Sequence, residues 1–531
     1  MIKVKVTLIS LVLLMTEVDP ARILIVLPFP AHSHHIFSTA IMKALVQRGH
    51  HIVEYSPIPP VKPIINHTYV EIHTRFEKEL SGWSYEGFIH QTTHLDKSFF
   101  GCKFRRIWEM NYPICEDTFS HPNIQKLLKS QEAFDLVMVE STFGQESLLA
   151  LGHRFSAPTI AIETLLPFSI LNRQAGNSLD ISSVPDLTSP VFENDPMSFM
   201  DRVLNLISVS LTLFQHHYIH LPLQEEIVKK YFNEPLPPLA DMVLNVSLYL
   251  SNSYPTTISH VRPYTQNIVH IGGITISPDR ADLPQDILRF MDNAKEGVVF
   301  FSLGTVVPLH LMPKDIIQIF INVFKKMPQR IIWKISQLDP SFDVPKNVMV
   351  KKWAPQAGIL AHPNCKAFIT HGGLMSTHEA LHSGVPTVGI PFFADQPFNV
   401  KFMEHRGVGK QVNFFSLSEE TLSKALNLIL SDPKYKQNAM KLSKVYRDRP
   451  YTADESAVFW VEYVLKYRGA QHLRPTSATM SFLQLYLLDV MAAIIVILLC
   501  AGFIIYSTVK ALLTMIQRNR KTLSNKKKLR K

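Results

Sequence analysis

The segment 353–396 contains side chains whose types and order suit the binding of a nucleoside diphosphate. A short apolar run, 367–370, leads into His371-Gly372-Gly373, and a helix is expected to begin near Ser376. Two glycines let a ligand approach the backbone closely, and the first turn of a helix offers free N–H groups at the positive end of its dipole. His371 and Ser376 can add hydrogen bonds to phosphate oxygens. The alternative is a tight turn that caps a helix and binds nothing.

Polar and aromatic side chains on both sides of this turn extend the hypothesis to a sugar nucleotide. Glu379, one turn into the expected helix, can accept hydrogen bonds from a ribose diol. Trp353 offers a flat face on which a base could stack, with the Gln356 amide beside it, although a core tryptophan is the alternative. Asp395 and Gln396 follow another expected strand, where they can bind sugar hydroxyls.

A second group of candidates lies in the loop expected at 31–35, which contains His32, His34 and His35. A neutral imidazole has an ordinary pKa of about 6.5, so it can take a proton from a hydroxyl near pH 7. Three histidines in four positions could instead bind a metal ion, but no Cys or carboxylate lies nearby in the sequence. We therefore expect one of the three to act as a base and the others to pack or cap.

The run WAPQAGILAHPNCKAFITHGGLMSTHEALHSGVPTVGIPFFADQ, 353–396, resembles the signature of the UDP-glycosyltransferase family, and it is most similar to insect and insect-virus members. FSLGT at 301–305, the segment 457–475 and the C-terminal end of the chain are similar too. The resemblance implies a GT-B fold with a UDP-sugar in the C-terminal half and an apolar acceptor in the N-terminal half. It implies uracil on Trp353, ribose on Glu379, diphosphate on His371, Ser376 and Thr305, and sugar on Asp395 and Gln396.

The resemblance also implies the catalytic pair. It places the base at His34 and its orienting carboxylate at Glu140, where family members usually have Asp. His34 would take a proton from the acceptor hydroxyl, which would attack the anomeric carbon opposite UDP and invert an α-linkage to β. No Asp-x-Asp occurs in the chain, so we expect no metal and no other cofactor. Met375 departs from the family, since plant and vertebrate members usually have Asn there, and one phosphate contact is lost or replaced.

The motif by itself decides neither which sugar the donor carries nor which molecule accepts it. Insect-like members of the family favour UDP-glucose and vertebrate members UDP-glucuronate, and we expect glucose. The segment 60–260 should form the acceptor pocket, and its composition suits small lipophilic alcohols or phenols, as in detoxification or in hormone and pigment conjugation. The alternative is a degenerate member that binds lipophilic molecules without turnover, which Glu140 and Met375 would favour.

Buried strand runs alternate with helices in two halves of the chain, and this pattern predicts two Rossmann-like, doubly wound α/β domains. The first unit is a strand at 22–27, a helix at 36–47 and a strand at 51–55, and the pattern starts again at Gly297. We expect an acceptor domain at 21–262, a linker at 263–290 and a donor domain at 291–475 that ends in a returning helix, with the two domains facing a cleft. Neither first strand leads into G-x-G-x-x-G, which disfavours a nicotinamide or flavin enzyme.

The two ends of the chain predict a membrane-anchored protein. Lys3 and Lys5 precede a short apolar run, which predicts a signal peptide at 1–20, and the uncharged run 490–509 is long enough for a transmembrane helix. The basic tail, 510–531, resembles a di-lysine endoplasmic-reticulum retrieval signal, with Leu529 in place of a Lys, and the alternative is a polybasic stretch that lies beside anionic lipid. The positive-inside rule places this tail in the cytosol, so we expect a single-pass type I protein of the endoplasmic-reticulum membrane with lumenal domains.

Composition and charge set the remaining limits. The chain has 531 residues, of which 46% are apolar and 18% charged, and these shares exclude a disordered or fibrous protein. The net charge of +10 arises mainly in the tail, which has nine Lys or Arg and no acid, so we expect no nucleic-acid partner. Asn66 and Asn245 begin glycosylation sequons, and Cys102 and Cys115 could form a bridge. The sequence leaves open whether the chain forms a homo-oligomer.

Overall fold

A computed structural model of the chain describes residues 19–77, 84–90, 103–141, 143–191, 196–254, 261–276, 283–305 and 307–528. The chain divides into two compact units, Met1–Pro475 and Thr476–Lys531. All but the last two residues of the expected signal peptide lie outside the described residues, as does Cys102. Cys115 is buried with a free thiol, so the bridge considered for it is not formed.

The first half of the larger unit is built on a parallel sheet of seven described strands in the order β3-β2-β1-β4-β5-β6-β7. The strands are β1 (Arg22–Val26), β2 (His51–Ser56), β3 (His67–Glu71), β4 (Leu136–Val139), β5 (Thr159–Glu163), β6 (Leu248–Ser251) and β7 (Ile268–His270). The helices and short helical turns of this half are α2 (His32–Gln47), α5 (Lys103–Ser120), α6 (Pro122–Lys129), η1 (Glu146–Leu149), α7 (Ala150–Arg154), α8 (Ser169–Ala175), α9 (Phe199–Gln215), η2 (His216–His220), α10 (Leu221–Tyr231) and α11 (Leu239–Leu244).

The second half repeats the design with six described parallel strands in the order β10-β9-β8-β11-β12-β13. The strands are β8 (Val298–Ser302), β9 (Arg330–Lys334), β10 (Val348–Lys351), β11 (Cys365–Thr370), β12 (Thr387–Gly389) and β13 (Gly409–Gln411). The helices and helical turns are α12 (Gln285–Asp292), η3 (Leu309–Leu311), α13 (Lys314–Lys325), α14 (Gln356–Ala361), α15 (Leu374–Ser383), α16 (Gln396–His405), η4 (Phe414–Ser416), α17 (Glu419–Ser431), α18 (Pro433–Arg447) and α19 (Ala453–Lys466).

Both sheets confirm the predicted doubly wound fold. All four residues of β4 and all five of β8 are buried, because helices cover both faces of a parallel sheet. In each sheet the chain runs outward from the first strand and then returns to that strand's other side, so β4 lies beside β1 and β11 beside β8. Ligands of such sheets bind at the carboxyl ends of the strands at this switch point.

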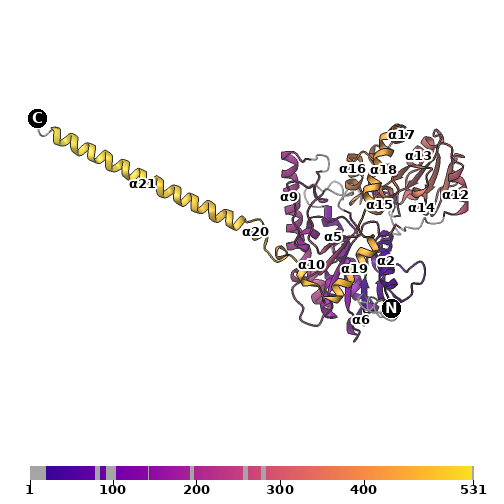
Figure 1. The fold of residues 1–531 in the computed structure, drawn as a ribbon, viewed down its shortest axis with the longest axis horizontal. Coiled ribbons are helices and arrows are strands. Elements are labelled where there is room, and N and C mark those ends of the chain that lie inside the picture. Colours follow the sequence, from indigo (N-terminus) through magenta and orange to yellow (C-terminus); the bar gives the residue numbers. More distant parts are fainter. Residues whose placement is uncertain are drawn as a thin grey trace, which may run out of the picture. The chain divides into compact units, whose positions relative to one another are not determined.

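Contacts late in the chain tie the two halves together. Helix α19 lies beside α2 (Figure 1), and Ala457, Val461 and Val464 are buried in the core of the first sheet. Arg449, which follows α18, donates to the Gly272 carbonyl oxygen at 2.7 Å. The range 263–290, expected as a linker, contains strand β7 and the start of α12, so it contributes an edge strand to the first sheet.

The helical segment 199–231, which runs through α9, η2 and α10, has an unusual distribution of side chains. Its buried positions include the polar residues Asn205, Ser208, Thr212, His216, His220 and Gln224. Its exposed positions include the apolar residues Leu206, Ile207, Leu211, Phe214, Tyr218 and Ile219. A buried polar face needs internal hydrogen-bond partners, and His216 and His220 find theirs in the Glu146 carboxylate of the neighbouring η1.

The smaller unit contains η6 (Thr476–Ala478), α20 (Phe482–Leu485) and the long helix α21 (Leu488–Lys528); the turn η5 (Gln471–Leu473) precedes it. Among the described residues, one helix is long and apolar enough to cross a membrane, and it covers the expected span at 490–509. The helix continues into the basic tail, since the sequence has no Gly or Pro after Gly502 to end it.

Candidate active site

The expected catalytic histidine lies in the first turn of helix α2. The helix begins at His32, so the prediction of a loop at 31–35 was wrong. The reason is local, because no Gly or Pro occurs between Pro30 and Gly49 to interrupt the helix. His32 is exposed, whereas the buried His35 donates from Nε2 to the Phe29 carbonyl oxygen at 2.8 Å. His34 is therefore the candidate base among the histidines of this turn.

His34 and Glu140 form a hydrogen-bonded pair at the switch point of the first sheet. His34 Nδ1 lies 2.9 Å from Glu140 Oε2, and Glu140 is 2% exposed. The Thr164 hydroxyl donates to the other carboxylate oxygen, Oε1, and lies 3.2 Å from the same ring nitrogen. Because an ionised carboxylate only accepts, Nδ1 carries the proton and the Nε2 lone pair is left to take another.

Thr164 was not among the residues expected from the sequence. It directly follows β5, which pairs with β4, so its hydroxyl reaches the carboxylate at the end of the neighbouring strand. The signal that could have found it is a polar residue placed immediately after a buried strand.

Aromatic side chains surround the imidazole of His34. The rings of Phe29 and Phe143 each lie 5.1 Å from the His34 ring, and Phe76 stacks on Phe29 at 5.7 Å. Each of the three phenylalanines is less than 10% exposed, so this aromatic wall gives the imidazole an apolar environment.

Asp395, which follows β12 of the second sheet, interacts with His34 of this pair. It directly precedes helix α16 and is 8% exposed, and the Asn399 amide donates to its Oδ2 at 2.7 Å. Burial raises the pKa of Asp395, and the charge of His34 acts in the opposite direction. The carboxyl group of Asp395 and the imidazole of His34 therefore lie within electrostatic reach of each other, although they come from different sheets. Ala394, just before Asp395, has a φ of 56°, a left-handed conformation that is uncommon outside glycine.

His371 sits in a cradle formed by two glycines. A Cβ added to Gly304 would come 2.7 Å from the ring, and one added to Gly373 would come 2.6 Å from it. Burial lowers the pKa of His371 to about 4, helped by the charge of Lys334, so the ring is neutral at pH 7. Within the described structure its buried Nδ1 has no hydrogen-bond partner. This unpartnered polar nitrogen makes His371 a candidate ligand-binding residue.

Gln356, Ser376 and Glu379 are linked by hydrogen bonds beside this cradle. The Gln356 amide donates to Ser376 Oγ at 2.9 Å and to Glu379 Oε2. Burial raises the pKa of Glu379 to about 7, while Gln356 and the cation of Lys334 oppose the rise. The structure thus brings together His371, Gly372, Gly373, Ser376 and Glu379 at the start of α15.

Trp353 and Thr305 are both exposed. Trp353 is 69% exposed, so it is not a core tryptophan; Trp333 has that position. Thr305 follows β8 in the turn that also contains Gly304, whose φ is 77°. Gln396 is buried, and its side-chain oxygen accepts from the Phe392 backbone N–H at 2.9 Å, so this oxygen holds its own loop in place.

The fold agrees with what the chain resembles. A family model described as "UDP-glucoronosyl and UDP-glucosyl transferase" matches residues 22–528. The chain belongs to the UDP-glycosyltransferase family. UDP-glycosyltransferase UGT5 from Dactylopius coccus is 34% identical over 92% of this chain and 91% of the relative. UDP-glucuronosyltransferase 2B33 from Macaca mulatta is 31% identical over 91% of each chain.

Solved structures agree on the fold. A UDP-glucosyltransferase from Polygonum tinctorium, solved with 3,4-dichloroaniline, superimposes with a TM-score of 0.55 at 14% identity, covering 85% of this chain and 99% of that one. This structural similarity shows that the chain described here has the GT-B fold. Membership of the family supports sugar transfer from a UDP-sugar as its reaction.

Two further residues of the donor region bear on nucleotide binding in this UDP-glycosyltransferase. Met375 lies half-buried in the first turn of α15, and its thioether offers no hydrogen-bond donor. Lys334, at the end of β9, was not expected from the sequence. Burial lowers its pKa, and its charge acts on both His371 and Glu379. Lys334 is thus a cation beside the residues expected to hold the nucleotide.

Proposed function

We propose that this UDP-glycosyltransferase moves a hexosyl group, preferably glucose, from a UDP-sugar to the hydroxyl of a small lipophilic acceptor with inversion. The observation that carries the proposal is the pairing of His34 Nδ1 with Glu140, at 2.9 Å, within electrostatic reach of Asp395 from the other sheet. This arrangement supports a base on the acceptor side of the reaction and a sugar-binding residue on the donor side.

In the proposed reaction, His34 Nε2 takes the proton of the acceptor hydroxyl as its oxygen forms a bond to the anomeric carbon. The bond from that carbon to the UDP oxygen breaks on the opposite face, so an α-linked donor gives a β-linked product. Glu140 stabilises the imidazolium that forms, as the carboxylate of a catalytic triad does. The backbone N–H groups that begin α15 and the neutral His371 ring stabilise the charge that grows on the diphosphate.

The donor lies along the strand ends of the second sheet in this proposal. Exposed Trp353 stacks on uracil, and Glu379 accepts from the ribose hydroxyls. The diphosphate lies on Thr305, His371 and Ser376, where Gly372 and Gly373 let it approach the backbone. Asp395 and Gln396 bind the sugar. We propose that these residues suffice without a catalytic metal ion, since dipoles and neutral donors face the diphosphate.

The acceptor is proposed to be a lipophilic alcohol or phenol, of the kind conjugated in detoxification or in hormone and pigment metabolism. Phe29, Phe76 and Phe143 beside His34 support this class, because an aromatic wall binds apolar rings and disfavours charged molecules.

We also propose that the folded unit faces the lumen of the endoplasmic reticulum, with α21 as a single type I span. Asn66 and Asn245 are exposed, as N-linked glycosylation requires. Protease protection of microsomes and a mobility shift on removal of N-glycans test this topology. Digestion of the folded unit in intact microsomes would contradict it.

One incubation separates the candidate functions. The full-length protein in microsomes is given a phenolic acceptor with UDP-glucose and, separately, with UDP-glucuronate. We expect a β-glucoside by NMR from the first donor. A β-glucuronide as the dominant product would instead favour the activity of the macaque relative, and an α-glycoside would contradict inversion. Binding of both substrates with no product would support the degenerate lipophile-binding alternative.

A further inference from the structure

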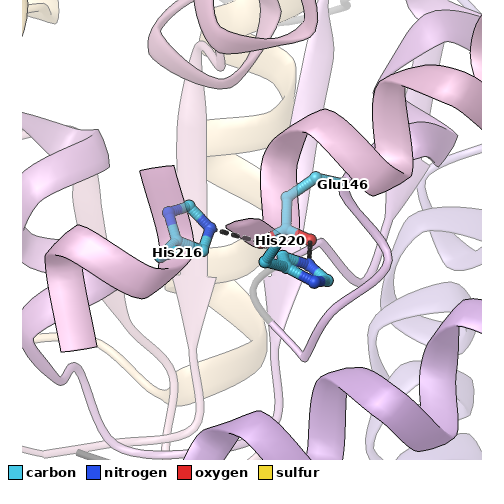
Figure 2. Close-up of side chains that lie close together, drawn as sticks. All are labelled: Glu146, His216 and His220. Carbon is cyan, nitrogen blue, oxygen red and sulfur yellow. Dashed lines mark hydrogen bonds and ion pairs between the residues drawn. The ribbon is translucent and has the colours of Figure 1, made fainter. Parts of the chain in front are cut away.

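A second cluster of reactive side chains lies away from the catalytic pair. Glu146 from η1 and His216 and His220 from η2 are each less than 10% exposed. Both imidazoles point to the same carboxylate (Figure 2). His216 Nε2 lies 2.8 Å from Glu146 Oε1, and His220 Nε2 lies 2.7 Å from Oε2. We propose that these three residues bind one divalent transition-metal ion, with Zn²⁺ as the best match.

The donor set selects the ion. Two imidazole nitrogens and one carboxylate oxygen are ligands typical of Zn²⁺, whereas Mg²⁺ and Ca²⁺ prefer oxygen alone. The alternative is a carboxylate that simply accepts two N–H bonds. The Nε2 atoms of His216 and His220 can each bind a cation while the ring is neutral. Moving the ring proton from Nε2 to Nδ1 frees the Nε2 lone pair and leaves the charge of the imidazole unchanged.

The distances allow this exchange with little movement. Tetrahedral Zn²⁺ bound at about 2.0–2.1 Å holds its donors about 3.3 Å apart. In the structure all three donor atoms lie within 4.8 Å of one another, and the two hydrogen-bonded pairs are at 2.7 and 2.8 Å. Small rotations of the side chains would therefore open the cluster around one ion. Among the described residues this is the group with such a donor set, so one ion per chain is expected.

The surrounding elements hold both imidazoles in position. η2 is a π-helical turn between α9 and α10. Such turns are rare in proteins, and those that occur often lie at functional sites. Trp108 from α5 stacks on the His220 ring at 4.9 Å and lies 5.7 Å from the His216 ring. This packing restricts ring rotation, as in metal sites whose surrounding shell orients the ligands, and a water molecule would complete the tetrahedral coordination.

The site is structural in this proposal and takes no part in sugar transfer. Glu146 follows Glu140 by six residues, and Phe143 between them contacts His34. Trp108 and Phe143 belong to the same hydrophobic core. The ion would therefore fix the polar face of the segment 199–231 against the aromatic wall near His34. Its removal should lower thermal stability and raise KM for the acceptor, while KM for the donor stays the same.

Metal binding can be measured directly on the full-length protein in detergent. After treatment with a chelator and its removal, Zn²⁺ should bind with a stoichiometry of one and raise Tm. Co²⁺ should give the visible absorption bands of a tetrahedral site, and Mg²⁺ should do neither. Glu146→Gln and His220→Asn each remove a ligand and should weaken Zn²⁺ binding by at least about 100-fold, since the loss of outer partners alone costs 10–100-fold.

His217→Gln is the matched control, because His217 lies in the same turn but is exposed. It should bind Zn²⁺ as the wild-type protein does. Equal binding by His217→Gln and His220→Asn would overturn the proposal in favour of surface binding. A wild-type protein that takes up neither Zn²⁺ nor Co²⁺ would show that the cluster is hydrogen-bonded only, and this result holds even if the Glu146 variant fails to fold.

Discussion

Glu140 Oε2 lies 2.9 Å from His34 Nδ1, although 106 positions separate the two residues in the sequence. They meet because β1 and β4 are neighbours at the switch point of the first sheet, and both residues follow the carboxyl ends of these strands. The Glu140 side chain reaches the ring at a normal hydrogen-bond length. The carboxylate is buried and also receives the Thr164 hydroxyl, so its position is fixed from two sides.

Replacing His34 tests the base. His34→Ala should lower kcat by about 10²–10⁴-fold, the usual contribution of general base catalysis, and should leave the Kd for UDP unchanged. Turnover by product chromatography and UDP binding by calorimetry measure the two effects. His32→Ala, two residues earlier on an exposed position of the same turn, should retain wild-type turnover. Wild-type kcat in the His34 variant would refute its role.

Replacing Glu140 tests the positioning of the base. Glu140→Gln keeps the size of the side chain but removes the charge that stabilises the imidazolium, so kcat should fall by about 10²–10⁴-fold while both KM values stay nearly the same. Glu140→Asp should recover part of the loss, and Thr164→Val should cost less than Glu140→Gln. If all three variants lost the same fraction of kcat and the same number of degrees in Tm, Glu140 would have a purely structural role.

The pKa of Glu379 predicts how donor binding depends on pH. Burial raises this pKa to about 7, and binding of the ribose hydroxyls requires the ionised carboxylate as acceptor. As pH falls through 7 the group takes a proton, so UDP should bind about tenfold more weakly at pH 6 than at pH 8. Calorimetry of UDP binding at several pH values measures this. Glu379→Gln has no such group, so the part of the pH dependence that arises from Glu379 should disappear; an identical profile in both proteins would contradict the assignment.

Gly373 is expected to set the position of His371. A Cβ at Gly373 would lie 2.6 Å from the His371 Nε2, whereas the φ of −59° at this position suits any residue. Gly373→Ala should therefore displace the ring and weaken UDP binding by roughly tenfold, the effect of losing about one hydrogen bond to a charged group. Calorimetry measures the affinity, and thermal unfolding checks that the fold persists. A wild-type Kd would show that His371 does not contact the diphosphate.

Features that depend on neighbouring residues could be predicted from the sequence. Continuous apolar runs indicated parallel strands, since a strand buried on both faces has no polar positions. The turn His371-Gly372-Gly373 and the helix that follows it are local too. The start of α2 was predicted four residues late, because the histidines at 32–35 resemble loop residues, although nothing in their backbone preferences prevents a helix.

Features that depend on strand order could not be predicted in this way. Thr164 and Lys334 join the site only because β5 lies beside β4 and β9 beside β8. The cluster of Glu146 with His216 and His220 joins residues that are 70 and 74 positions apart. The two histidines lie on the polar face of the helical segment 199–231, whose apolar face is exposed, so periodicity alone would assign their side chains to the solvent.

The sequence by itself determined the two α/β halves, the long apolar C-terminal helix and the residue types that could bind a sugar nucleotide, because each depends on composition or on spacing along one element. The tertiary structure alone decided which of these residues share a site. Hydrogen bonds and electrostatic coupling act over a few ångströms in space, and strand pairing and helix packing bring together His34, Glu140 and Asp395 from distant parts of the chain.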